Sequence, residues 1–231
     1  MIHTHALTFQ YLNGSKLTFP DVSLPQGAVL LLSGPSGCGK STWLALVAAL
    51  MLPTSGEGTV AGQHLTTLKK IAADAWRAKA IGFLPQKLHL SAALTVAQNL
   101  ALAQWASGTH EDQAAVTQAL AALGVADLAQ RLPAQLSGGQ AQRAAMARAV
   151  LLKPQVILAD EPTASLDDDA AAAAVTLLLT TAQAQGATLV IATHDARVAA
   201  LLEPLLASQN RLHMLNLPRR PETCAADPCA Q

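Results

Sequence analysis

The sequence predicts an α/β fold, and three features support that prediction. A short apolar stretch at 28–33 runs into a glycine-rich segment and then into a helical pattern at 41–52. Two more apolar stretches, at 156–159 and 188–192, are typical of buried strands. An alanine- and leucine-rich stretch at about 169–185 predicts a helix between them. Strands that alternate with helices indicate an α/β core.

Further strands are expected in the first third of the chain. Apolar and polar residues alternate over 6–11, which predicts a half-buried strand. Residues 17–24 predict a second strand, which Pro20 restricts to an edge or an irregular position. Short strands are also expected at 59–61 and 81–84.

A long helical segment separates the two halves of this α/β core. Residues 92–150 follow a helical pattern with a few glycine and proline breaks. We interpret about 89–150 as a helical subdomain inserted into a domain of residues 1–218. The proline-rich, polar residues 219–231 are expected to form a disordered tail.

The composition excludes several classes of protein. Hydrophobic residues make up 51% of the 231 residues and charged residues 13%, which argues against disorder. Lys+Arg and Asp+Glu are balanced at 15 each, so no nucleic-acid partner is expected. The longest apolar run, 43–52, falls short of the roughly 18 residues that span a membrane. The chain start lacks a signal-peptide pattern and three cysteines make no disulfide framework, so we expect a cytoplasmic protein.

A phosphate-binding loop follows the strand at 28–33. Glycines let its backbone N–H groups point at phosphate oxygens, and the helix that follows adds positive partial charge. Lys40 can reach the β- and γ-phosphates of a nucleotide, and the Ser41 hydroxyl suits Mg²⁺. A chance glycine turn would not combine a preceding strand with a following helix. The loop has the pattern G-x-x-x-x-G-K-[ST] and consists of Gly34, Pro35, Ser36, Gly37, Cys38, Gly39, Lys40, Ser41 and Thr42.

Two adjacent acids, Asp160 and Glu161, end the apolar stretch at 156–159. Side chains alternate along a strand, so the two carboxylates should point in different directions. Asp160 is placed to hold Mg²⁺, directly or through water, and Glu161 to orient and polarise an attacking water. Two acids after a strand are often only solvated, but the upstream phosphate loop favours the functional interpretation.

A pentapeptide between the phosphate loop and the acidic pair resembles the signature of the ATP-binding cassette (ABC) ATPases. It reads Leu136-Ser137-Gly138-Gly139-Gln140. The resemblance covers about residues 5–215, because the other motifs of that family follow in the same order. Gln86 resembles the Q-loop glutamine and Asp167, in Ser165-Leu166-Asp167, the D-loop aspartate. His194 resembles the switch histidine, and Tyr11 the aromatic residue that stacks on adenine.

The resemblance implies a P-loop NTPase core with an N-terminal antiparallel β piece and an inserted helical subdomain. It also implies ATP and Mg²⁺ as cofactors and hydrolysis of ATP to ADP and phosphate. Lys40, Ser41 and Asp160 of one subunit would hold the nucleotide. In a second copy of the chain, the signature residues would close over the γ-phosphate, which gives a two-fold dimer with two equivalent sites. These signature residues are Ser137, Gly138, Gly139 and Gln140.

The remaining motif residues receive their roles from the same resemblance. Gln86 would sense the nucleotide, contribute to the metal site and relay the state to a partner. His194 would contact the γ-phosphate, and Asp167 would couple the two sites. With Glu161 as the catalytic base, Lys40→Ala is expected to weaken ATP binding, and Glu161→Gln to bind ATP but hydrolyse it poorly.

The resemblance also implies a separate integral-membrane permease, which would hold the chain at the inner face of the cell membrane. The sequence at 60–65 and 81–86 resembles that of the lipoprotein-release and macrolide-export group, which includes division-linked cassettes. Two features depart from that group: Ala164-Ser165-Leu166-Asp167 replaces Gly-Asn-Leu-Asp, and Ala141 follows Gln140 directly where a second glutamine is expected.

Two alternative functions stay open. One is a soluble ABC ATPase of translation or DNA repair, which a single phosphate loop and a short helical segment disfavour. The other is a division-type ATPase that signals across the membrane without moving a substrate.

Overall fold

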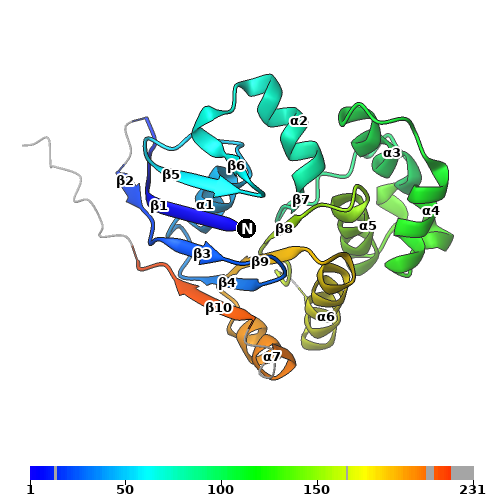
Figure 1. Ribbon diagram of the computed structural model, residues 1–231. Coiled ribbons are helices and arrows are strands. Elements are labelled where there is room, and N and C mark those ends of the chain that lie inside the picture. The colour runs from blue at the N-terminus through cyan, green and yellow to red at the C-terminus, as the bar shows by residue number, and fades with distance from the viewer. Residues whose placement is uncertain (13–14, 165, 207–210, 220–231) are drawn as a thin grey trace, which may run out of the picture.

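A computed structural model describes residues 1–12, 15–164, 166–206 and 211–219 of the chain. Two β-sheets and the helices around them make up the fold (Figure 1). The first sheet is parallel throughout and confirms the predicted α/β class. Its two central strands are buried along their whole length, as their apolar sequences predict. In spatial order its strands are β10 (Leu212–Asn216), β4 (Val29–Ser33), β9 (Thr188–Thr193), β8 (Val156–Asp160) and β7 (Ile81–Leu84).

The register of the parallel sheet brings the carboxyl ends of four strands to one edge. Ser33 pairs with Thr193 and Asp160 pairs with Ala192. Leu84, at the end of β7, pairs with Ala159. Ligand sites of parallel α/β sheets form at this edge, and the loops after β4, β7, β8 and β9 all begin there.

The second sheet is antiparallel and contains the N-terminal strand β1 (Ile2–Gln10). The strand predicted at 17–24 is wrong as a single element, because the chain forms two short strands on either side of Pro20. A proline cannot donate a ladder hydrogen bond, which accounts for the interruption. The strand expected at 59–61 is the end of a longer one. The partners of β1 are β2 (Lys16–Thr18), β3 (Val22–Leu24) and β5 (Ser55–Val60), and β6 (Gln63–His64) pairs with β5.

Helix α1 (Lys40–Val47) follows the phosphate loop and packs between the two sheets. Trp43 and Leu46 are fully buried there, in one apolar cluster with residues of β1, β8 and β9. The helix is shorter than the predicted 41–52. The chain leaves the helical conformation after Val47, and Ala49 has a left-handed φ of 51°.

Three helices lie between β7 and β8 in the chain and form the green region of Figure 1. Helix α5 (Gly138–Val150), together with α6 (Asp168–Gln185) and α7 (Ala196–Leu206), covers the other face of the parallel sheet. The other two inserted helices pack on α5, and all five helices share a second apolar cluster. Helix α6 lies where a helix was predicted, and Gly186 ends it with a left-handed φ of 62°. The three helices are α3 (Val96–Ala106), α4 (Gln113–Ala122) and α5 (Gly138–Val150), with short 3₁₀ turns at Leu65–Thr67, Ala126–Leu128 and Pro133–Gln135.

Sequence analysis did not predict α2 (Lys70–Ala80), α7 or β10. The tail predicted at 219–231 lies outside the described residues except for Arg219. Within the described ranges, no helix has both the length and the apolar character that a membrane span requires.

Candidate functional site

A pocket of about 230 Å³ opens at the carboxyl edge of the parallel sheet. It gathers residues from Ser36 to His194, because the loops after β4, β7, β8 and β9 all contribute to it. Its lining residues are Ser36, Gly37, Gly39, Lys40, Ser41, Thr42, Gln86, Glu161 and His194.

Lys40 lies at the centre of this pocket and is only 6% exposed. Its Nζ donates to the carbonyl oxygens of Gly34 at 2.8 Å and Pro35 at 3.3 Å. It also lies 3.4 Å from Oε1 of Glu161. The ammonium group therefore binds oxygens of its own loop, and phosphate oxygens can take the same positions.

The backbone of the phosphate loop requires glycine where the sequence supplies it. Gly34, Gly37 and Gly39 all have positive φ angles. A Cβ on Gly34 would lie 2.6 Å from the carbonyl oxygen of Leu217 and 2.8 Å from Sγ of Cys38. The loop leads into the N-terminus of α1, whose free N–H groups favour an anion.

Asp160 lies at the end of β8, behind the pocket lining. Burial raises the pKa of its carboxyl group, and a hydrogen bond from the Ser41 side chain opposes that shift. Among the described residues, buried Oδ1 of Asp160 has no hydrogen-bond partner. An orphaned carboxylate oxygen beside a hydroxyl group fits a hard cation such as Mg²⁺, which prefers oxygen ligands.

Glu161 follows β8 and has a left-handed φ of 48°. Its Oε2 accepts a hydrogen bond from Oγ1 of Thr193 at 2.8 Å, and its Oε1 lies 2.9 Å from Nδ1 of His194. Burial raises the pKa of Glu161, but the hydrogen bonds from His194 and Thr193 and the charge of Lys40 outweigh it, so the net pKa is lowered. Glu161 is therefore an oriented, ionised carboxylate at the pocket wall.

Two of the predicted nucleotide residues lie beside the pocket and do not line it. The Tyr11 hydroxyl lies 2.7 Å from Oγ1 of Thr42, and the Tyr11 side chain is 42% exposed. The Cys38 thiol is buried and packs with the apolar cluster around α1.

The predicted signature residues begin α5 and lie apart from this pocket. Oγ of Ser137 accepts from the N–H of Gln140 at 3.3 Å, and Oε1 of Gln140 accepts from the N–H of Ser137 at 2.9 Å. This capping box fixes the helix start. A Cβ on Gly138 or Gly139 would meet no described atom within 4 Å, so this helix N-terminus is open to approach. Gly138 shares a second cavity, of about 200 Å³, with Gln86 and Glu161.

The structure adds residues that sequence analysis missed. Thr193 orients Glu161, and Asp195 accepts hydrogen bonds from Thr163 and Arg197. Arg148 donates to the carbonyl oxygens of Leu88 and His89 at 2.7 Å. The positions of Thr193 and Asp195 on either side of His194 were an available signal. Arg148 gave none, because its partners Leu88 and His89 are distant in sequence.

A strand, glycine loop and helix that place a lysine against two carboxylates define a nucleotide-hydrolysing P-loop protein. A sequence profile described as ABC transporter matches residues 17–164, which is more than half of the chain. The chain belongs to the ABC transporter family and is an ATP-binding and ATP-hydrolysing subunit of that family.

Two curated relatives illustrate its place in the family. The lipoprotein-releasing system ATP-binding protein LolD of Shewanella frigidimarina is 35% identical over 210 residues, which cover 90% of this chain and 86% of that protein. The sn-glycerol-3-phosphate import ATP-binding protein UgpC of Chromohalobacter salexigens is 38% identical over 208 residues. That alignment covers 89% of this chain but only 55% of UgpC.

Solved structures have the same fold. The dimeric bacterial ABC transporter cassette MJ0796 is 31% identical, with a TM-score of 0.80 and coverage of 94% of both chains. A second dimeric structure of that cassette, in a post-hydrolysis state with ADP and Pi, has a TM-score of 0.78 at 30% identity. It covers 87% of this chain and 91% of that one.

Proposed function

We propose that this subunit hydrolyses ATP to drive a separate membrane permease of the lipoprotein-release type. The observation that carries the proposal is the pocket that gathers Lys40, Ser41, Gln86, Glu161 and His194 at one sheet edge. The similarity to LolD over most of both chains supports an exporter more than an importer, because the chain spans only about half of UgpC.

ATP would enter with its phosphates on the loop before α1. Its β- and γ-phosphate oxygens would replace the carbonyl contacts of Lys40, whose charge would stabilise the transferred phosphoryl group. Ser41, Asp160 and Gln86 would hold Mg²⁺, which neutralises phosphate charge when bound. Glu161, oriented by Thr193 and His194, would accept the proton of the attacking water, and ADP and phosphate would leave.

A second copy of the chain would complete each site. The N-terminus of α5 suits the γ-phosphate of a facing subunit, because Gly138 and Gly139 place no side chain over it. The capping box of Ser137 and Gln140 occupies only the N–H groups of those two residues. Asp167, at the N-cap of α6, would lie at the same interface. The dimeric structures of the similar cassette MJ0796 support this arrangement.

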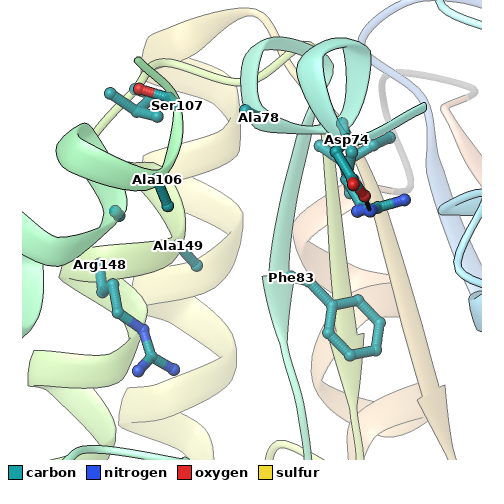
Figure 2. Close-up of a pocket in the computed structure, with 11 residues that line it drawn as sticks. Asp74, Ala78, Phe83, Ala106, Ser107, Arg148 and Ala149 are labelled. Atoms are coloured by element: carbon teal, nitrogen blue, oxygen red, sulfur yellow. Dashed lines mark hydrogen bonds and ion pairs between the residues drawn. The ribbon is translucent and has the colours of Figure 1, made fainter. Parts of the chain in front are cut away.

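The permease would dock in a groove of about 460 Å³ that lies between α3 and α5 on one side and α2 and β7 on the other. Figure 2 shows Ala106, Ser107 and Arg148 on one wall and Asp74 and Phe83 on the other. The first wall belongs to α3 and α5, and the second to α2 and β7. Arg148 also holds the carbonyl oxygens of Leu88 and His89, which follow Gln86. Partner contacts in the groove can therefore reach the nucleotide pocket, and would hold the subunit at the inner membrane face.

The test is a capture experiment on membranes of the source cell. Tagged Glu161→Gln protein with ATP and Mg²⁺ should retain a polytopic membrane protein, identified by mass spectrometry. The matched control is tagged Lys40→Ala protein, which should retain less because it lacks the phosphate contact. Recovery of ribosomes or DNA alone would contradict a transport function. A captured permease without lipoprotein-release activity after reconstitution would contradict the proposed cargo.

A further inference from the structure

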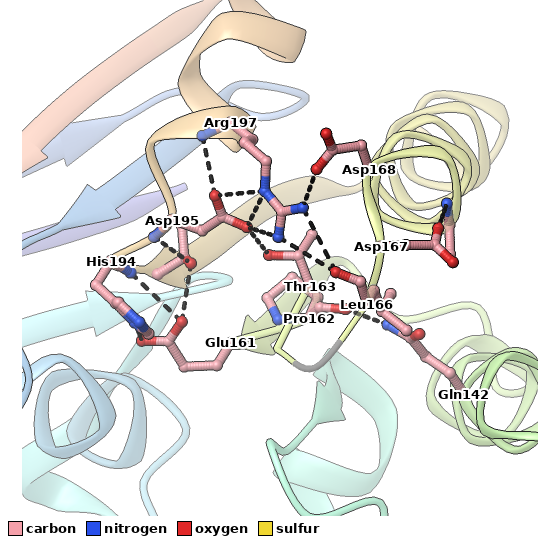
Figure 3. A network of polar contacts seen from close by, with 12 residues as sticks. Gln142, Glu161, Pro162, Thr163, Leu166, Asp167, Asp168, His194, Asp195 and Arg197 are labelled. Carbon is pink, nitrogen blue, oxygen red and sulfur yellow. Dashed lines mark hydrogen bonds and ion pairs between the residues drawn. The ribbon is translucent and has the colours of Figure 1, made fainter.

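Arg197, in the first turn of α7, lies at the centre of a polar network that extends from Glu161 to Asp168 (Figure 3). Its guanidinium group contacts two loops at once. Nε lies 3.0 Å from Oδ1 of Asp195, and Nη2 lies 2.8 Å from Oδ2. Nη1 lies 2.5 Å from Oδ1 of Asp168, and both Nη atoms lie 3.4 Å from the carbonyl oxygen of Leu166.

One arm of this network reaches the catalytic carboxylate. The N–H of Asp195 donates to Oγ1 of Thr193 at 3.0 Å, and that hydroxyl donates to Glu161. Oδ2 of Asp195 also accepts from Oγ1 of Thr163 at 2.8 Å. Glu161 and Arg197 line a common cavity of about 360 Å³, so the network opens directly onto the site.

The other arm brackets Asp167. Leu166 and Asp168, its neighbours on each side, are both bound by Arg197, while the carboxylate of Asp167 accepts from the N–H of Ala170 at 2.8 Å. The segment before α6 is thus fixed against the segment before α7. Both contacts need a planar group with several donors, which arginine has and lysine lacks.

We propose that Arg197 is a positioning residue that makes the loop of Asp167 and the loop of His194 and Glu161 move as one unit. The inference rests on the proposed dimer, since Asp167 would face the second subunit there. A change at the interface would then alter the orientation of Glu161 through Arg197 and Asp195. Hydrogen bonds from Arg197 and Thr163 outweigh burial and lower the pKa of Asp195 to about 2, so the link is charged at neutral pH.

Arg197→Ala is expected to lower kcat by roughly 2- to 30-fold, the range of a coupling network. KM for ATP should change little, because Arg197 does not line the phosphate pocket. The dependence of rate on ATP should lose cooperativity. Arg197→Lys should restore only part of the rate. Lysine can keep the ion pair with Asp195, but it cannot contact Asp195, Asp168 and the Leu166 carbonyl at the same time. Arg131→Ala, which removes an exposed arginine of the helical region, is the matched control.

A double-mutant cycle with Asp168→Asn tests the coupling. If the two loops are joined through Arg197, then Arg197→Ala and Asp168→Asn have non-additive effects on kcat. Asp168 is exposed, and within the described part of the chain its side chain bonds only Arg197, so its variant should fold even if Arg197→Ala does not. Additive effects, or a kcat for Asp168→Asn equal to that of wild type, would overturn the proposal.

Hydrogen exchange separates this inference from the proposed function. In the nucleotide-free wild-type monomer, amides of the segment 166–170 should exchange more slowly than in Arg197→Ala. Equal exchange rates would overturn the link itself. Faster exchange in the variant, together with a wild-type protein that never dimerises with ATP, would retain the link and refute the dimer.

Discussion

Asp160 and Glu161 show, at the scale of single residues, how the pKa values of two adjacent carboxyl groups shift in opposite directions. Asp160 ends a fully buried strand, and burial raises its pKa. Glu161 has a left-handed φ and contacts Thr193, His194 and Lys40, and its pKa is lowered. The surroundings of Asp160 therefore favour its protonated form, and those of Glu161 favour its ionised form.

The first prediction concerns Mg²⁺ and pH. Protons compete with Mg²⁺ for Asp160, so the apparent Mg²⁺ affinity of the ATP-bound protein should fall as pH drops toward the raised pKa of that carboxyl group. The measurement is a Mg²⁺ titration of ATPase activity at several pH values, with nucleotide protonation corrected. Asp160→Asn should show a weak, pH-independent affinity. A wild-type affinity that stays constant down to the ordinary range of aspartate would contradict this.

The second prediction concerns Gly34. Gly34→Ala places a Cβ 2.6 Å from the carbonyl oxygen of Leu217 at a φ of 148°. Gly27→Ala is the matched control, because Gly27 also has a positive φ, of 75°, but open space at the Cβ position. Gly34→Ala should cost at least about 1 kcal/mol more in the free energy of unfolding. Urea unfolding measures the loss in the free energy of unfolding for each variant. Equal losses would show that the backbone at Leu217 moves aside for the added Cβ at little cost.

At the scale of elements, the sequence predicted those strands and helices whose burial is uniform. Strands β4, β8 and β9 are almost wholly buried and therefore apolar throughout. Helix α2 was missed because only Ala73 and Ala80 are buried in it, so no apolar stripe marks it. Helix α7 contains Pro204, and β10 is an edge strand with no fully buried residue.

The candidate site divides in the same way. Lys40 and Glu161 occur in local motifs, so their types and spacing predicted them. Arg148 and Arg197 could not be predicted, because their partners lie up to 60 positions away and only the fold brings them together.

The third prediction concerns α5, which has the signature at its N-terminus and Arg148 in its last turn. Among the described residues Arg148 pairs with no carboxylate, and burial lowers its pKa, so it depends on the carbonyls of Leu88 and His89. His89 has a left-handed φ of 48° that this contact stabilises. Arg148→Ala should therefore lower the permease-bound ATPase rate several-fold more than the rate of the isolated subunit, while Arg131→Ala lowers neither. Equal losses in the two assays would exclude a docking role.

At the scale of the whole molecule, the proposed dimer would build each nucleotide site from two chains. Lys40 lines the phosphate pocket, whereas Ser137 lies at the start of α5 and does not line it. In a two-fold dimer, each nucleotide would lie between the phosphate loop of one subunit and the signature of the other. Defects in the two halves should then compensate when they lie on different subunits.

The fourth prediction uses that geometry. Lys40→Ala removes the phosphate contact, and Ser137→Arg places a bulky cation in the facing half, so each variant alone should be nearly inactive. A mixture of the two forms heterodimers with one intact site, built from the Lys40 of one subunit and the Ser137 of the other. Purified by different tags on the two subunits, these heterodimers should recover ATPase activity. The control mixes wild type with the Lys40→Ala, Ser137→Arg double variant, whose heterodimers have one defective half in each site and should stay inactive. Activity in both heterodimers would mean that each chain hydrolyses ATP without the signature of its partner. Activity in neither heterodimer would mean that the two sites must act together.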